Sequence, residues 1–370
     1  MIRCGSVIGF NLIALAGCGG GRSQGARATT TSPIQLQSAM TDSAIDAILA
    51  QYNRPDVPGA SVIVLSHGKV AYERAFGNAD LNGHTRATIH TDYRLASLTK
   101  AFTAMSIMLL VKDGKLRYDD RVIDVLPGLP GYAREIRIYQ LLTHTSGIVD
   151  YEDFVPDSQR TQLDDEDVLR LMQRTDTLNF EPGSAYHYSN SAYVLLGLVV
   201  QHVSGMPFPK FLHDRIFAPL HMDSTVAHIE GVSKVPERAY GYTGDSTGHF
   251  TRTDQSSTSA TLGDGGIYTS VVDMEKWSDA LDHATLVDAE AMAKAWSPTM
   301  LTTGRESDYG YGWFVAMVRG EKQLRHHGES TGFTNAILKY PARQLTIIVL
   351  TNRTGGNPWD IADRIAALFP

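Results

Sequence analysis

Residues 94–111 read RLASLTKAFTAMSIMLLV, and this stretch indicates both a structural element and a site. Leu98 to Val111 is almost entirely apolar and is followed by Asp113-Gly114, which predicts a long buried helix that stops at a glycine. Lys100 is the exception, because a lysine in an apolar helix needs a polar partner for its charge. Ser97 opens the helix three residues earlier, so the two side chains share one face.

Ser97 and Lys100 together meet the requirements of a nucleophilic site. A nucleophilic serine needs an adjacent base and donors for developing negative charge, and a helix N-terminus supplies unpaired N–H groups. The alternative is an ordinary N-cap serine. The same spacing recurs at Ser66 and Lys69, but that copy lies in a predicted hairpin turn. We therefore predict that Ser97 is the nucleophile.

Apolar runs at both ends of the chain predict the fold class. Ala60 to Leu65 and Val70 to Phe76 form an expected β-hairpin, and a final helix is expected from about Trp359 to Leu368. Between them, C-terminal strands are expected at Gly312 to Val318, Gln323 to His326, Thr334 to Tyr340 and Leu345 to Thr351. The sequence predicts an α/β protein of the α+β type: an antiparallel sheet from both chain ends, flanked by helices, with an inserted helical subdomain.

The inserted subdomain is expected at about 118–300, and the whole domain at 41–370. Thr41 or Asp42 is expected to cap the first helix. Within the insertion, helical patterns cover Ile138 to His144, Asp165 to Arg174, Ala192 to Val203 and Val272 to Leu281.

Tyr188-Ser189-Asn190 is the only Y-x-N motif in the chain. It follows the turn Glu181-Pro182-Gly183 and precedes the apolar helix, so Tyr188 and Asn190 are expected to project from a loop edge toward a cleft. The alternative is a surface tyrosine beside an Asx cap.

His326-His327-Gly328 is the only H-x-G motif. It lies at the end of a predicted strand, where Gly328 permits close approach of a ligand backbone. The alternative is a pair of cross-strand polar residues. On a strand, the side chain of His327 is expected to face away from Ser97.

Ser330 lies in a G-x-S-x-G pattern at residues 328–332, which is typical of the nucleophile elbow of α/β-hydrolases. That elbow requires a strand, a sharp turn and a helix, whereas Phe333 to Tyr340 has the composition of a strand. An α/β-hydrolase that uses Ser330 is therefore a minor alternative.

Composition excludes several classes of protein. The 370 residues include 33 lysines and arginines against 40 acids, for a net charge of -7, and no basic tract of five or more residues occurs. Nucleic acid is therefore not an expected partner. The sequence contains neither H-E-x-x-H nor paired C-x-x-C motifs, so we expect no metal and no cofactor.

The N-terminus has the pattern of a lipoprotein leader. Arg3 precedes an apolar stretch from Val7 to Ala16, and the stretch ends in Leu15-Ala16-Gly17-Cys18, which resembles a bacterial lipobox. We expect a signal peptide at 1–17, a lipidated Cys18, and a Gly- and Ser-rich flexible tether at 18–40. The protein would then be exported and held by lipid on a bacterial membrane, facing the periplasm or the exterior. The alternative is a plain secretory leader.

The order of these motifs resembles the superfamily of serine β-lactamases and penicillin-binding proteins, and within it the class C-like group. The resemblance covers about 42–369. Its further segments are Leu141 to Gly147, Tyr193 to Gly197, Pro219 to Met222, Gly265 to Ser270 and Tyr311 to Trp313.

The resemblance implies a role for each candidate residue. Ser97 would be acylated, Lys100 would tune its proton, and Tyr188 would shuttle protons if a cation such as Lys100 lowers its pKa. Asn190 would orient Lys100 and the substrate. The backbone N–H groups of Ser97 and of Glu329, which follows Gly328, would stabilise the oxyanion. His326 would take the place of the lysine in the K-T-G motif of β-lactamases.

The third motif leaves the substrate open. A histidine is mostly neutral at pH 7 and gains charge as the pH falls through its ordinary pKa, so His326 suits a carboxylate less well than a lysine does. The expected activity is a serine hydrolase that forms an acyl-enzyme with a small ester, an amide or a peptidoglycan-like substrate. It could be an esterase, a peptidase for D-residues or a weak β-lactamase. A catalytically silent binding protein is the alternative.

Overall fold

The computed structural model describes residues 33–369. Contacts divide the chain into the units Met1–Met40 and Thr41–Pro370, and the first helix, α1, spans Pro33–Ile48. The predicted tether was wrong in its last residues, because the helix begins at Pro33 and Thr41 lies inside it rather than at its cap. Proline has the backbone angle that a first helical residue needs. The leader 1–17, Cys18 and the tether up to residue 32 lie outside the described residues.

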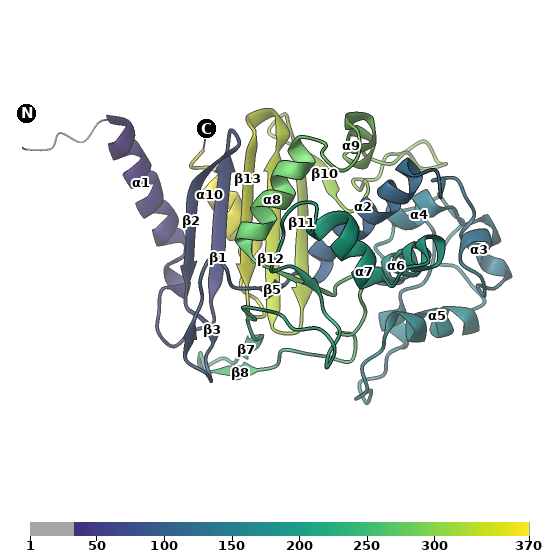
Figure 1. Cartoon of the computed structure of the whole chain (residues 1–370), viewed down its shortest axis with the longest axis horizontal. Helices are drawn as coiled ribbons and strands as arrows, with labels where there is room; N and C mark the ends of the chain where they lie inside the picture. Colours follow the sequence, from purple (N-terminus) through teal and green to yellow (C-terminus); the bar gives the residue numbers. More distant parts are fainter. Residues whose placement is uncertain (1–32, 370) are drawn as a thin grey trace, which may run out of the picture. The chain divides into compact units, whose positions relative to one another are not determined.

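A six-stranded antiparallel sheet joins the two ends of the chain, as predicted (Figure 1). Its order is β10-β11-β12-β13-β1-β2, so the N-terminal hairpin adds to the C-terminal strands through the β1–β13 pair. The strands are β1 (Ala60–Ser66), β2 (Lys69–Phe76), β10 (Phe314–Val318), β11 (Glu321–Ser330), β12 (Phe333–Tyr340) and β13 (Leu345–Thr351).

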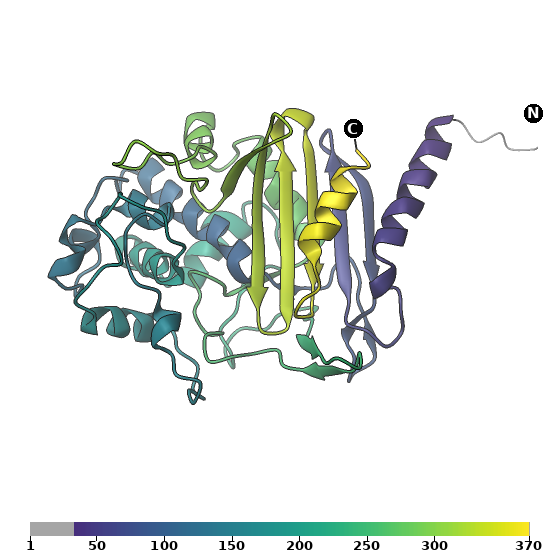
Figure 2. The same cartoon turned by 180° about the vertical axis from the view of Figure 1, so that it is seen from behind.

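Both faces of the sheet are covered, which explains the unbroken apolar runs in β1 and β13. Val62 and Val64 face a core shared with α10 (Pro358–Ala366), which lies across the sheet in Figure 2. Ile63 and Leu65 face the larger core, which includes residues of α8 (Val271–Asp282) and α2 (Thr99–Lys112). Alternate side chains of one strand therefore bind the two layers together.

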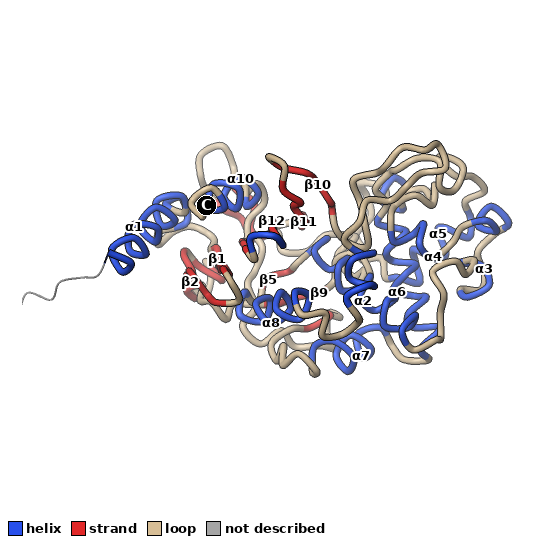
Figure 3. The backbone as a smooth tube through the Cα atoms, turned by 90° about the horizontal axis from the view of Figure 1, so that it is seen from above, coloured by secondary structure: helices blue, strands red, loops and turns tan. Residues whose placement is uncertain are grey.

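The remaining helices gather beside the sheet, as predicted for the inserted subdomain (Figure 1 and Figure 3). They are α3 (Val122–Val125), α4 (Ile138–Leu142), α5 (Asp165–Arg174), α6 (Asn190–Ser204), α7 (Phe208–Leu212) and α9 (Ala289–Ala295). In the described part of the chain, no single helix is long and apolar enough to span a membrane; only α6 together with 208–217, bent by 78°, meets that test.

Short strands were missed because two or three residues show no periodicity. They are β3 (Asn78–Asp80), β4 (Thr85–Arg86), β5 (Tyr93–Arg94), β6 (Val226–Ala227), β7 (Tyr242–Gly244), β8 (Phe250–Arg252) and β9 (Ile267–Thr269). The small sheet β5-β9-β6 matters for the site, because β5 leads directly into the segment of Ser97.

Candidate active site

Ser97 lies at an elbow between a strand and a helix. After β5, Ala96 adopts a left-handed φ of +50°, and a 3-10 helix at Ala96–Leu98 then runs into α2. A residue with a β-carbon is strained in this conformation, and such strain often marks functional sites. The strand, sharp turn and helix that an elbow requires are thus found at Ser97.

Ser330 lies in a different setting. It is the last residue of β11, and the chain turns directly into the antiparallel strand β12 at Phe333. The alternative of an α/β-hydrolase nucleophile at Ser330 is therefore wrong, because no helix follows the turn.

Lys100 has polar partners, as expected for a lysine in an apolar helix. The side chain is fully buried, and its Nζ lies 3.0 Å from Ser97 Oγ. It also donates to Asn190 Oδ1 at 2.8 Å and to the backbone oxygen of Asp264 at 3.1 Å. The structure thus brings together residues from the first and second predicted motifs.

Asp150 anchors the helix that presents Asn190. Its Oδ2 accepts a 2.6 Å hydrogen bond from the backbone N–H of Asn190, at the start of α6, while Ser189 Oγ accepts one from Ala192. Two oxygens therefore satisfy donors at this N-terminus and hold it in place. Asp150 and Asp264 were missed from the sequence, because single acids in loops carry no recognisable spacing.

Burial moves the pKa values of Lys100 and Tyr188 in opposite directions. It lowers the pKa of Lys100 to about 8, against the raising effects of Asp264, Asp150 and Glu152. It raises the pKa of Tyr188 above its ordinary 10, and the hydrogen bond with Ser97 offsets this only in part. We expected a neighbouring cation to lower the pKa of Tyr188. The structure differs, although Lys100 Nζ lies 4.9 Å from the centre of the tyrosine ring.

Gly328 brings β11 against the elbow. A β-carbon at this position would lie 2.0 Å from the carbonyl oxygen of Leu95, so no larger residue fits. The close approach predicted here is thus made by the chain itself rather than by a ligand backbone. Pairing with β10 ends at Arg325, which leaves that edge of β11 free at Gly328 and Glu329. The two predicted sources of oxyanion donors, Ser97 and Glu329, therefore belong to segments in direct contact.

His326 is buried and neutral. Tyr309 Oη lies 2.9 Å from Nε2, and the carbonyl oxygen of His327 lies 2.7 Å from Nδ1. A carbonyl can only accept, so Nδ1 carries the proton and Nε2 accepts from the tyrosine. Burial and the charge of Lys100 lower the pKa of His326 to about 3. The expectation that His326 gains charge near its ordinary pKa is therefore wrong.

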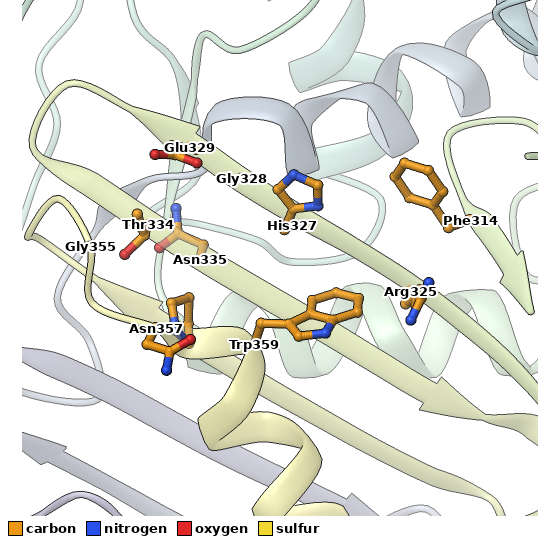
Figure 4. A pocket seen from close by; sticks show the side chains of 11 residues that line it. Phe314, Arg325, His327, Gly328, Glu329, Thr334, Asn335, Gly355, Asn357 and Trp359 are labelled. Atoms are coloured by element: carbon orange, nitrogen blue, oxygen red, sulfur yellow. The ribbon is translucent and has the colours of Figure 1, made fainter. Parts of the chain in front are cut away.

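His327 faces the other side of β11, as expected from strand alternation. It is exposed and lines a cavity together with Phe314 and Trp359 (Figure 4). Of the two histidines, His327 is thus the one that an incoming ligand can reach from this cavity.

His144 holds the loop that carries Tyr188. Its Nδ1 accepts a 3.1 Å hydrogen bond from the N–H of Ser189, and its carbonyl oxygen accepts one from His187 at 3.0 Å. The ring also packs on Tyr188, with centroids 4.3 Å apart. The sequence included His144 only within a recognisable segment, because a contact between residues 144 and 189 leaves no local pattern.

A model of the Beta-lactamase family matches residues 42–369. The chain belongs to the Beta-lactamase family. It is 31% identical over 309 residues to Penicillin-binding protein 4* of Bacillus subtilis, which covers 79% of this chain and 68% of that protein. A penicillin-binding protein from Bacillus halodurans shares the fold with a TM-score of 0.76 and 28% identity, over 88% of this chain and 99% of that one.

The octameric penicillin-binding protein homologue of Pyrococcus abyssi is also similar, with a TM-score of 0.75 and 27% identity over 89% of this chain and 76% of that one. These findings confirm the resemblance and the predicted fold class. Membership of the Beta-lactamase family supports chemistry of the serine hydrolase type and leaves the substrate open.

Replacing His144 tests how the tyrosine loop is held. We expect His144→Phe to destabilise the protein by about 1–3 kcal/mol, because the buried N–H of Ser189 loses its acceptor. His144→Asn should retain most of the stability, since asparagine offers an oxygen and tolerates the left-handed φ of +56° found here. Urea unfolding and hydrogen exchange at the Ser189 amide would measure both effects.

His67→Phe is the matched control, because His67 is exposed and has a similar φ of +54°. It reports the backbone strain of a phenylalanine together with the loss of one exposed hydrogen bond, the 3.0 Å contact between the His67 ring and Ser66 Oγ. If His67→Phe costs as much as His144→Phe, or if exchange at Ser189 does not change, the hydrogen bond to His144 is not what holds the loop.

Proposed function

We propose that the protein is a serine hydrolase that cleaves an ester or amide through an acyl-enzyme on Ser97. The observation that carries this proposal is the set of three oxygens around Lys100 Nζ: Ser97 Oγ, Asn190 Oδ1 and the backbone oxygen of Asp264. Two of them belong to carbonyl groups, which can only accept hydrogen bonds. A neutral Lys100 would direct its two N–H bonds to these carbonyls and its lone pair to the Ser97 hydroxyl.

Lys100 is therefore the proposed base. Its pKa of about 8 leaves a useful neutral fraction near neutral pH, whereas the raised pKa of Tyr188 keeps the phenol protonated. Ser97 transfers its proton to Lys100 and attacks the carbonyl carbon. The resulting oxyanion accepts hydrogen bonds from the N–H groups of Ser97 and Glu329.

Tyr188 is the proposed proton donor to the leaving group. As the tetrahedral intermediate collapses, the phenol gives its proton to the departing oxygen or nitrogen and is reprotonated by the charged Lys100. Water then attacks the acyl-enzyme with the same groups in reverse roles, which releases the acid and restores Ser97. Protons and charge balance over the cycle, and no metal or cofactor is required.

We propose an ester or amide with no carboxylate beside the scissile bond, such as a small neutral ester or an internal amide of a peptidoglycan-like chain, as the substrate class. The third motif offers no fixed cation, because His326 is buried and its pKa is lowered to about 3. A β-lactam carboxylate would therefore find no counter-ion at that position. The alternative, a silent binding protein, does not account for a buried lysine held against a serine hydroxyl.

Covalent labelling tests the nucleophile. A fluorophosphonate probe should attach to Ser97 in the wild-type protein, and Ser97→Ala should lose both the label and at least about a thousand-fold in turnover of p-nitrophenyl esters. Ser330→Ala is the control and should retain label and activity. Peptide mapping locates the label. A label on Ser330, or wild-type rates in Ser97→Ala, would contradict the proposed mechanism. The absence of any label would favour the alternative, a catalytically silent binding protein.

The pH profile tests the base. With neutral Lys100 as the reactive form, kcat/KM should rise with pH and level off above about 8. Glu152 raises the pKa of Lys100, so Glu152→Gln should move this rise to lower pH. Asp157→Asn is the control in the same loop, because the exposed Asp157 is not among the groups that shift Lys100 or Glu152, and it should leave the profile in place. If Glu152→Gln leaves the pH dependence of kcat/KM unchanged, the rise in kcat/KM belongs to the titration of a group other than Lys100.

We also propose that Cys18 carries lipid and holds the enzyme on a bacterial membrane. Each buried methylene contributes about 0.8 kcal/mol, so several acyl chains suffice for stable attachment. Cys18→Ser should release the protein from the membrane fraction or leave an uncut precursor. Mass spectrometry of the wild-type N-terminal peptide is the direct measurement, and an unmodified Cys18 in a soluble protein would contradict the proposal.

A further inference from the structure

A cavity of about 500 Å³ lies between strands β10 to β12 and the start of α10 (Figure 4). This volume is typical of small-molecule pockets. The side chains that line it include Phe314, Arg325, His327, Glu329, Asn357 and Trp359. Gly328 and Glu329 line the cavity and also belong to the segment of the proposed oxyanion site, so one segment of β11 borders both.

A continuous row of aromatic rings joins Tyr188 to this cavity. Phe314 stacks on Tyr188, with centroids 6.5 Å apart and an angle of 2° between the planes. Its ring is also nearly parallel to His327 at 6.1 Å, and His327 meets Trp359 edge-on at 6.1 Å. The wall of the cavity therefore begins at the group that we propose as proton donor to the leaving group.

The cavity presents little net charge. The guanidinium of Arg325 lies 4.9 Å above the Trp359 ring, and it also interacts with Asp363, a carboxyl whose pKa burial raises and Arg325 lowers. Glu329 contributes the opposite charge at the other end. The Trp359 ring thus already covers one face of the Arg325 guanidinium, and an anionic ligand in the cavity would also be repelled by the Glu329 carboxylate.

We infer that this cavity binds the leaving group of the substrate and selects an uncharged group with an aromatic ring. The inference rests on the proposed function, because only a substrate cleaved at Ser97 has a leaving group beside Tyr188. Ring-to-ring contacts add to the burial of apolar area, so an aromatic group gains more here than an aliphatic group of equal size.

Four esters that share one acyl group test the inference: ethyl, cyclohexylmethyl, benzyl and 4-carboxybenzyl acetate. We expect kcat/KM to be highest for benzyl acetate. In Trp359→Ala the ratio of benzyl to ethyl should fall by about five- to ten-fold, and Trp359→Phe should retain most of it. Ethyl acetate is the internal reference, because any loss of folded enzyme affects both esters equally.

Met317→Ala is the matched control. Met317 lies on β10 with Phe314 but is 69% exposed and does not line the cavity, so its variant should keep the wild-type ratio. Equal rates for benzyl and ethyl acetate, or an unchanged ratio in Trp359→Ala, overturn the inference and leave the proposed function intact. A preference for 4-carboxybenzyl overturns it too, because the cavity would then bind anions through Arg325.

Labelling of Ser97 separates the two proposals. A wild-type protein that labels on Ser97 but hydrolyses none of the four esters contradicts the inference alone, since benzyl acetate meets its stated requirements. A protein that neither labels nor hydrolyses contradicts the proposed function, and the inference with it.

Discussion

The burial of Lys100 is the constraint on which the site depends. A charged side chain removed from water is costly unless its donors are paired, and removing one partner of a buried charge typically costs about 3–5 kcal/mol. Its three oxygens come from Ser97, Asn190 and Asp264, which belong to separate segments of the chain. The elbow, the start of α6 and the loop before β9 must therefore converge for the fold to be stable. The contacts that stabilise Lys100 are the same contacts that build the site.

Convergence of this kind explains why unusual backbone positions lie around Ser97. Ala96 takes a strained left-handed conformation, and Gly328 allows β11 to approach the carbonyl of Leu95. Neither feature adds buried apolar surface, and neither would be needed if the backbone followed a regular strand or helix at these positions. The apolar side chains buried in the large cores on both faces of the sheet stabilise the fold and offset the energetic cost of this strain. In this protein the sheet and the packed helices are the rigid frame, and one of the strained residues, Ala96, lies directly before the serine that the frame presents.

Long apolar or periodic segments were predictable from the sequence, and contacts between distant segments were not. The helix after Ser97 and strand β13 were found because their composition alone requires burial. The short strand β5 and the loop acid Asp150 were missed, because two residues or a single carboxylate carry no periodic signal. The protonation of His326 also depended on partners distant in sequence, Lys100 and Tyr309. The family motifs identified which residues come together at the site. Their protonation states depend on burial and on neighbouring groups, which only the three-dimensional structure shows.

The protonation states of Lys100 and Tyr188 give these two residues different roles in the proposed mechanism. The neutral form of a lysine and the neutral form of a phenol are both favoured by burial, so one buried environment lowers the pKa of Lys100 and raises that of Tyr188. Lysine then becomes a proton acceptor near neutral pH, while tyrosine remains a proton donor. Groups whose pKa values are pushed in opposite directions in one site are typical of acid and base partners. The apolar surroundings of the helix after Ser97, visible in the sequence as a largely hydrophobic run, are therefore part of the proposed chemistry as well as of the core.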